Sequence, residues 1–481
     1  MKRISATDAV FLDLETPNAP MIIGGLFILD PSTAPGSFVR HRDILGYIED
    51  RLHLAPALRR KLVYHPLGLD EPRLIDDPDF DLEFHVRHLG LPKPRDWRQL
   101  KILTARLISR PMDMHRPLWE MYLIEGLEAL DGIPHDAFGV LLKMHHATFD
   151  GIAVGSAIAA LLQSTPDYHP TPPTKRWVPE RKPDMLGWTI SSLQEGMSQW
   201  LANIRSTPGV GKGVVATMRQ SVADFGSTKG REKAPPPKTR FQQRITTHRV
   251  WDFVRFDMNE IQDVRAKLGK PKMNDLLLCL IGGALRGYLE HHGELPPSPL
   301  QAFIPVNVRG AQSADEGGNH VSGFRVTLET NIPDPYERLI AIADVTRKAK
   351  EQVGAVGGDF AGSLLGMTPY SLRSRLMRGM AGFSEQFDVA MPAVASTVIT
   401  NAPLPRGGHY FTGAKVITYA GFGPVNDFVG LFHTITGADF EVNISFTSCR
   451  EILPDVDFYR ECLEASYAEL KALDTRALSL P

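Results

Sequence analysis

Apolar positions along the chain recur with two periods, and segments of both kinds alternate in both halves of the sequence. Leu100, Leu103 and Leu107 fall on one face of a helix, whereas the run 138–145 is short, apolar and typical of a strand. The pattern predicts helices over 8–15, 43–52, 100–108, 151–163, 274–289, 335–353 and 458–473. It predicts strands over 26–29, 119–124, 138–145, 251–256, 303–309, 324–328, 396–400, 415–420, 430–436 and 440–446. This mixture predicts an α/β or α+β fold with mixed sheets.

The globular pattern is interrupted between Thr165 and Ile245. Ten of the 37 prolines fall there, and 13 Lys/Arg against 6 Asp/Glu give the segment a net charge of +7, while the whole chain carries −2. Proline-rich stretches of this kind act as linkers. We therefore predict an N-terminal lobe at 1–164, a proline-rich basic linker at 165–244 and a C-terminal lobe at 245–481.

The linker contains one helical pattern of its own, at 186–204. Ile190, Leu193 and Trp200 recur at helical spacing, and Trp188 adds a second tryptophan. Such a basic, tryptophan-bearing helix suits a position on an anionic lipid surface. The alternative is that the same helix packs against its own protein.

Composition excludes several classes of protein. A chain with 43% hydrophobic and 22% charged residues is not disordered or fibrous, and a net charge near zero gives no general attraction to nucleic acid. Cys279, Cys449 and Cys462 lie too far apart for a disulfide framework or a cysteine zinc site. No signal-peptide pattern or apolar run of membrane-spanning length is found. We expect a cytoplasmic protein that at most rests on a membrane surface.

The most informative stretch is LLKMHHATFDG, at 141–151, in which an apolar strand runs into two histidines. Neighbouring side chains on a strand point to opposite faces, so His145 and His146 are not expected to share one task. Histidine is the usual general base near neutral pH, and Asp150 is suited to orienting the turn through an arginine. A purely structural role for both histidines is the alternative. A metal site is disfavoured because zinc helices space their histidines at i and i+4.

This stretch resembles a known family. HHATFDG fits HHxxxDG, the signature of the bacterial wax ester synthase/diacylglycerol acyltransferases, whose superfamily also includes CoA-dependent acyltransferases and nonribosomal condensation domains. The resemblance covers nearly the whole chain outside the linker. One departure is 400–405, TNAPLP, where the family usually has SNVPGP. Further matches are Asp8, Phe11 and Glu15 with Met21 and Gly24, the segment 76–92, Arg116 to Glu120 around a PLW motif, Asn274-Asp275, 305–309 and Gly318-Asn319.

The resemblance implies two chloramphenicol-acetyltransferase-like lobes with His146 in a tunnel between them. His146 would act as general base on a hydroxyl group, which attacks a fatty acyl-CoA thioester directly, without an acyl-enzyme. His145 would support it, Asp150 would form a structural ion pair with Arg309, and Asn274 and Thr400 would donate to the oxyanion. The remaining residues implied in substrate binding or structural support are Gly151, Asn401, Pro117, Leu118 and Trp119.

The implied partners are long-chain acyl-CoA as co-substrate, a fatty alcohol or diacylglycerol as acceptor, and an anionic membrane or lipid-droplet surface. No bound cofactor, metal or nucleic acid is implied. Each secondary motif has a structural interpretation too: Pro117–Trp119 as core packing, Asn274 as a helix cap and Arg309 as a surface residue. The alternative functions are a condensation-type enzyme that takes acyl groups from a carrier protein, and a non-catalytic lipid-binding protein.

Overall fold

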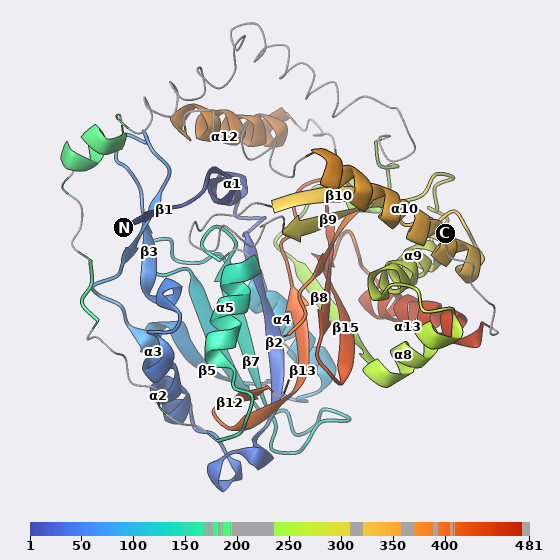
Figure 1. The fold of residues 1–481 in the computed structure, drawn as a ribbon, viewed down its shortest axis with the longest axis horizontal. Coiled ribbons are helices and arrows are strands. Elements are labelled where there is room, and N and C mark those ends of the chain that lie inside the picture. The colour runs from blue at the N-terminus through green and yellow to red at the C-terminus, as the bar shows by residue number, and fades with distance from the viewer. Residues whose placement is uncertain are drawn as a thin grey trace, which may run out of the picture.

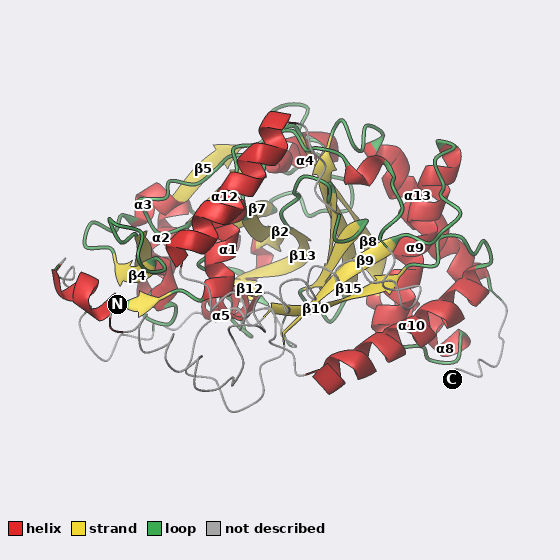
Figure 2. Cartoon of the chain, turned by 90° about the horizontal axis from the view of Figure 1, so that it is seen from above, coloured by secondary structure: helices red, strands yellow, loops and turns green. Residues whose placement is uncertain are grey.

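The computed structural model describes most of the chain, and its centre is formed by two six-stranded sheets that lie side by side (Figure 1). The residues described are 1–149, 151–167, 170, 177–180, 184, 186–192, 194, 235–307, 321–356, 370–387, 393–404, 407 and 409–473. Helices cover the outer faces of both sheets (Figure 2). The predicted mixed α/β fold with two lobes is therefore confirmed.

The N-terminal lobe is built on the sheet β12-β13-β2-β7-β6-β5. Only β5 and β6 pair in parallel, and the other neighbours are antiparallel. The central strand β7 is buried along its whole length. The strands are β12 (Tyr410–Phe411), β13 (Ala414–Phe422), β2 (Ile22–Asp30), β7 (Phe138–His145), β6 (Trp119–Glu125) and β5 (Val86–Gly90), and the helices around them are α1 (Ala6–Leu14), α2 (His41–Arg51), α3 (Leu82–His85), α4 (Trp97–Ile108) and α5 (Gly151–Leu161).

The C-terminal lobe is built on the sheet β10-β9-β11-β14-β15-β8. Strand β11 runs parallel to both of its neighbours, which makes this sheet mixed as well. The strands are β10 (Val321–Thr327), β9 (Gln301–Asn307), β11 (Thr397–Asn401), β14 (Leu431–Gly437), β15 (Glu441–Cys449) and β8 (Arg249–Asp257), and the helices are α8 (Met258–Lys267), α9 (Met273–His291), α10 (Pro335–Val356), α12 (Tyr370–Phe387) and α13 (Val456–Ala472).

The two lobes are interlocked by one strand from the C-terminal half. Strand β13 pairs with β2 in the N-terminal sheet, although the chain has already passed through most of the C-terminal lobe. Its backbone also contacts the other sheet, because the Gly421 carbonyl accepts hydrogen bonds from the Trp251 indole at 3.0 Å and the Ser445 hydroxyl at 2.6 Å. The strand predicted at 415–420 is therefore present, but it belongs to the sheet of the other lobe.

Helix α12 lies across α1 at the edge of the N-terminal lobe (Figure 2). The Ser374 hydroxyl donates to the buried Asp13 carboxylate at 2.6 Å, and Arg378 lies 3.3 Å from the same group. Arg373 donates to Glu71 at 3.2 Å. Glu71 lies two residues before β4 (Arg73–Asp76), which forms a small sheet with β1 (Lys2–Arg3) and β3 (Arg60–Val63). Helix α12 is thereby anchored to two separate parts of the N-terminal lobe.

Residues 186–192 of the linker pack on the N-terminal lobe, whereas Arg240 near its other end donates to Glu294 of the C-terminal lobe. Trp188 is buried against the His65 ring at 5.0 Å, and Ser192 donates to Asp70 at 3.1 Å. For residues 186–192 the alternative of packing against the protein itself is thus confirmed, and Trp188 is not available to a lipid surface. Leu193 and Trp200 lie outside the described residues. None of the helices in the described ranges combines the length and hydrophobicity that a membrane crossing needs.

Candidate active site

The two histidines lie where β7 ends, and their backbones are held from both sides. The His145 N–H donates to the Leu118 carbonyl at 3.0 Å, and the His146 N–H donates to the Met21 carbonyl at 2.8 Å. The second bond continues the β2–β7 ladder, whose last pair is Ile22 with His145, by one residue. The sheet therefore fixes the position of both residues.

His145 is completely buried, and one of its two ring nitrogens is hydrogen-bonded. Nδ1 accepts a hydrogen bond from the Ala147 N–H at 3.1 Å, which assigns the ring proton of the neutral side chain to Nε2. Nε2 lies 3.3 Å from Glu15 Oε2, an electrostatic contact whose angle falls short of a hydrogen bond. A histidine held in this way is suited to supporting the turn.

His146 is only partly buried and lies in a different environment. Its ring stacks on Phe11, with the ring centroids 3.8 Å apart and an interplanar angle of 14°. The prediction that the adjacent histidines have separate surroundings is confirmed. Of the two histidines, His146 is therefore the one that keeps some exposure.

Helix α1 supplies the contacts to both histidines. The helix starts in a capping box, in which the Ser5 hydroxyl accepts the Asp8 N–H at 3.0 Å and the Asp8 carboxylate accepts the Ser5 N–H at 3.3 Å. It ends at Leu14, so that Phe11 lies in its last turn and Glu15 follows directly. Sequence reasoning did not place these two residues at the site, although both stood among the matched positions of the resemblance.

The Pro117–Trp119 motif supports the site from the core. All three residues are buried, and the Trp119 indole donates to the Leu58 carbonyl at 2.7 Å. The His85 ring stacks on Trp119 at 4.7 Å, and its Nδ1 lies 2.7 Å from the Trp119 carbonyl oxygen. Burial lowers the pKa of His85, which keeps it neutral. The structural interpretation of this motif is confirmed, and its link to the site is the Leu118 carbonyl that holds His145.

The other candidates lie farther along the chain. Asp150 and Arg309 fall outside the described residues, and Gly151 is the first residue of α5. Thr400 and Asn401 end β11 in the C-terminal sheet, with Thr400 partly buried and Asn401 exposed. Their roles stay predictions.

Asn274 is the second residue of α9, and the interpretation of Asn274 as the cap of this helix is wrong. The N-cap position is Lys272, because the helix already begins at Met273. The neighbouring Asp275 is buried and accepts a hydrogen bond from the Thr346 hydroxyl of α10 at 2.8 Å. This half of the Asn-Asp motif therefore ties two helices of the C-terminal lobe together, while a role of Asn274 at the oxyanion stays a prediction.

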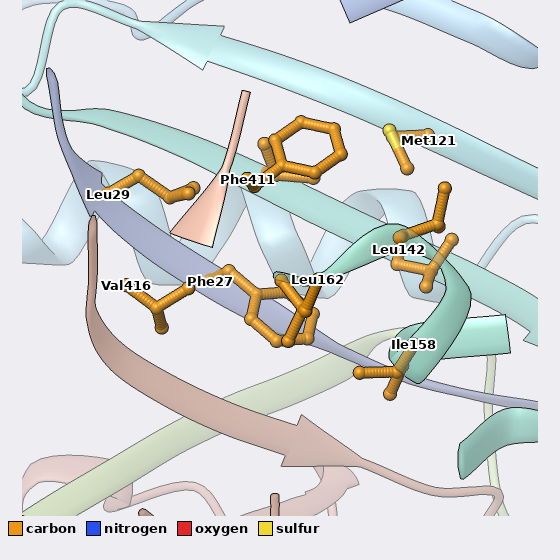
Figure 3. A pocket seen from close by; sticks show the side chains of 10 residues that line it. Phe27, Leu29, Met121, Leu142, Ile158, Leu162, Phe411 and Val416 are labelled. Carbon is orange, nitrogen blue, oxygen red and sulfur yellow. The ribbon is translucent and has the colours of Figure 1, made fainter. Parts of the chain in front are cut away.

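An apolar pocket lies between the N-terminal sheet and α5 (Figure 3). Every side chain that lines it is a hydrocarbon, an aromatic ring or a methionine. Leu142 and Phe27 form part of its floor, while Ile158 and Leu162 approach from α5 and the residue after it. Val140 and Leu142 of β7 lie on the face of the sheet that borders this pocket, and β7 ends at His145. The N-terminal sheet thus carries a wholly apolar pocket on the face that α5 covers.

Comparison with known proteins agrees with this arrangement. The family model described as the wax ester synthase/diacylglycerol acyltransferase catalytic domain matches residues 4–277, more than half of the chain, and the WS/DGAT C-terminal domain matches residues 317–471. The chain belongs to the wax ester synthase/diacylglycerol acyltransferase family. The resemblance found in HHATFDG and its companion motifs is therefore confirmed, and so is the predicted acyltransferase class.

Similar proteins fit this family. A Mycobacterium tuberculosis H37Rv protein that carries the name diacylglycerol O-acyltransferase is 29% identical over 459 residues, covering 95% of this chain and 87% of its own. The solved wax ester synthase/diacylglycerol acyltransferase of Marinobacter aquaeolei VT8 is 25% identical, with a TM-score of 0.65 and coverage of 98% and 99%. A trichothecene 15-O-acetyltransferase of Fusarium sporotrichioides shares the fold at 13% identity, with a TM-score of 0.58 and coverage of 98% and 95%.

Proposed function

We propose that this member of the family transfers a fatty acyl group from acyl-CoA to the hydroxyl of a fatty alcohol or of diacylglycerol, with His146 as general base. His146 takes the hydroxyl proton while the oxygen attacks the thioester carbonyl. The carbon–sulfur bond then breaks, and the CoA thiolate leaves and receives the proton. The observation that carries the proposal is the different setting of the two histidines: His145 is completely buried with Nδ1 hydrogen-bonded to the Ala147 N–H, while His146 keeps exposure.

Direct transfer, without an acyl-enzyme on a cysteine, is supported by the raised pKa values of the three cysteine thiols. Burial raises the pKa of the Cys279 and Cys462 thiols to about 11 and also raises that of Cys449. A cysteine nucleophile acts as its thiolate, so protonated thiols of this kind are poor nucleophiles near neutral pH. The oxyanion is assigned to donors on the C-terminal lobe, with Asn274 and Thr400 as candidates. Asp150 is assigned a structural ion pair with Arg309.

The test is a thiol-release assay on the purified full-length chain. Palmitoyl-CoA is supplied with hexadecanol or with dipalmitoylglycerol, and free CoA is followed. We expect CoA release that depends on the acceptor, together with wax ester or triacylglycerol in equal amount. Release without acceptor at the same rate would indicate hydrolysis instead. Transfer from an acyl carrier protein but not from acyl-CoA would favour a condensation-type enzyme.

The pocket beneath α5 is proposed as the place where the far end of the alkyl chain lies. A strand rises about 3.3 Å per residue, so Val140 lies about 17 Å along β7 from His145, the residue before the candidate base, a distance suited to a long chain. Ile158→Phe places a larger side chain in the lining of this pocket and so reduces the space inside it. We expect kcat/KM for palmitoyl-CoA to fall about tenfold or more, since each excluded methylene is worth about 1–3 kcal/mol, while octanoyl-CoA is used as before.

Ile158→Val serves as the matched control for this substitution, because it leaves the pocket open. The melting temperature of both variants separates pocket filling from a loss of stability. Equal losses with both chain lengths in Ile158→Phe would contradict the assignment of the pocket to the alkyl chain.

Peripheral association with an anionic membrane or a lipid inclusion also belongs to this proposal. The acceptors are lipids, and a peripheral enzyme meets them where they are concentrated. The linker helix predicted for this contact is not supported by its described part, because Trp188 is buried. Leu193 and Trp200, which also belong to this prediction, lie outside the described residues.

A further inference from the structure

Exposed apolar side chains are concentrated in one region of the surface. Of the fourteen large apolar side chains exposed in the described ranges, seven belong to α12, to the loop between β3 and β4, and to residues 186–192. On α12, Leu372 and Leu376 are 60% and 58% exposed, and in the loop Leu67 is 65% exposed. Isolated exposed leucines are ordinary, but a concentration of this kind marks an interaction surface.

The three segments are joined to one another through the β3–β4 loop. On one side, His65 lies 3.2 Å from the Thr189 hydroxyl and Asp70 accepts from Ser192. On the other side, Glu71 accepts from Arg373 of α12. Polar groups of the β3–β4 loop thus pair with polar groups of the other two segments. Leu67, Leu69, Ile190, Leu372 and Leu376 remain outside, and we call the surface with these five side chains the α12 face.

Arginines accompany the exposed leucines of the α12 face. Helix α12 carries three arginines and a single acid, Glu385. Arg373 is buried in its ion pair with Glu71, but Arg375 is exposed and Arg378 is 57% exposed beside Leu372 and Leu376. A helix with exposed leucines flanked by arginines has the chemistry that binds anionic lipid headgroups while its leucines enter the acyl region.

The α12 face is connected to the candidate active site through α1. Helix α12 packs on α1 through Ser374 and Asp13, and α1 places Phe11 on the His146 ring. Helix α1 therefore contacts both α12 and the candidate base (Figure 2 shows α12 lying across α1). A lipid surface in contact with α12 would therefore lie at the same end of the N-terminal lobe as the site.

We propose that the α12 face docks the protein on an anionic lipid surface. The inference rests on the proposed function in one respect: docking is useful because the acceptor alcohol or diacylglycerol is found in such a surface. The evidence for docking is the surface itself. Leu372 and Leu376 supply the apolar part of the binding and Arg375 the electrostatic part. The linker helix is not required for it.

The test measures flotation of the full-length chain with vesicles of phosphatidylcholine alone or mixed with phosphatidylglycerol. We expect the wild-type protein to bind the mixed vesicles more tightly, and the difference to shrink with added salt. Leu372→Ser with Leu376→Ser should weaken binding to both kinds of vesicle about tenfold or more. Arg375→Gln should remove only part of the gain from phosphatidylglycerol. The matched control is Phe38→Ser with Leu54→Ser, which are 48% and 47% exposed elsewhere on the protein and should leave binding unchanged.

A second readout separates the inference from the proposed function. Transfer from a short acyl-CoA to a water-soluble alcohol, without vesicles, should be the same in the wild type and in the Leu372/Leu376 variant. If the wild type lacks this transfer, the proposed function fails whatever the vesicles show. If transfer occurs and the Leu372/Leu376 variant still binds vesicles as the wild type does, docking through α12 is wrong. Docking is also overturned if the wild type ignores vesicles and sediments as a dimer that the variant dissociates, because the face then joins two copies.

Discussion

His146→Ala is expected to lower acyl transfer about 10²–10⁴-fold, the usual contribution of a general base. The loss should appear in kcat, since the side chain acts on the proton that leaves the hydroxyl in the transition state. Removing a partly exposed ring that stacks on Phe11 should change the melting temperature little. CoA release and thermal unfolding, measured on one preparation, test both statements.

His145→Ala is the matched control for this variant. It removes the acceptor of the Ala147 N–H and the partner of Glu15, and it leaves a cavity in a fully buried position. We therefore expect lower stability and a smaller loss of kcat than in His146→Ala. Small and equal effects of the two substitutions on kcat would refute the assignment of His146 as the base, and a larger effect of His145→Ala would reverse the two roles.

The core strands were predictable because their signal is local. The run 138–145 is apolar, ends at the first histidine and coincides with β7. The partner of a strand is not a local property, however. The apolar run within β13 predicts a strand. Its pairing with β2 could not be predicted, because the two strands lie almost 400 residues apart in the sequence. Helix α12 was not predicted, and its anchors on Asp13 and Glu71 come from the far end of the sequence.

At the candidate site, too, contacts between residues far apart in the sequence could not be predicted. The sequence predicted the two histidines and their opposite orientations, since strand geometry dictates them. It predicted neither the stacking of Phe11 on His146 nor the approach of Glu15 to His145, because these contacts join positions about 130 residues apart. The prediction of Asn274 as a helix cap failed by two residues, since α9 begins before the asparagine. Helix boundaries are the least certain part of any sequence pattern.

Glu120→Ala is expected to lower the free energy of unfolding by about 3–5 kcal/mol, the cost of leaving a buried charge without its partner. The Lys143 side chain is completely buried on β7, two residues before His145, and its ammonium donates to Glu120 at 3.1 Å and to the Arg110 carbonyl at 2.6 Å. Tyr122 donates to the same carboxylate at 2.7 Å. Chemical denaturation of Glu120→Ala and of the wild type measures the difference.

Two further variants give the Glu120→Ala measurement its controls. Glu120→Leu combined with Lys143→Met removes both charges and should recover most of the stability, since buried pairs can be replaced by apolar groups of similar size. Lys471→Ala breaks an exposed pair with Glu260, 3.2 Å apart, and should cost about 1 kcal/mol or less. A small loss in Glu120→Ala, similar to that in Lys471→Ala, would contradict the assignment of a buried, charged Lys143.

The pH dependence of Glu120→Ala provides the sharper test of the same pair. Burial lowers the pKa of Lys143 in the folded protein, and Glu120 opposes this by raising it. Without Glu120, the pKa of Lys143 in the folded protein falls further below its pKa in the unfolded chain. Between these two pKa values the unfolded state binds more protons than the folded state, so the free energy of unfolding rises with pH there. The deficit of Glu120→Ala relative to the wild type should therefore shrink as the pH is raised, because Lys143 becomes neutral in the folded variant, and it should be largest at lower pH. A deficit that is constant or grows with pH would show that the loss comes from packing and not from an unpaired ammonium beside the site.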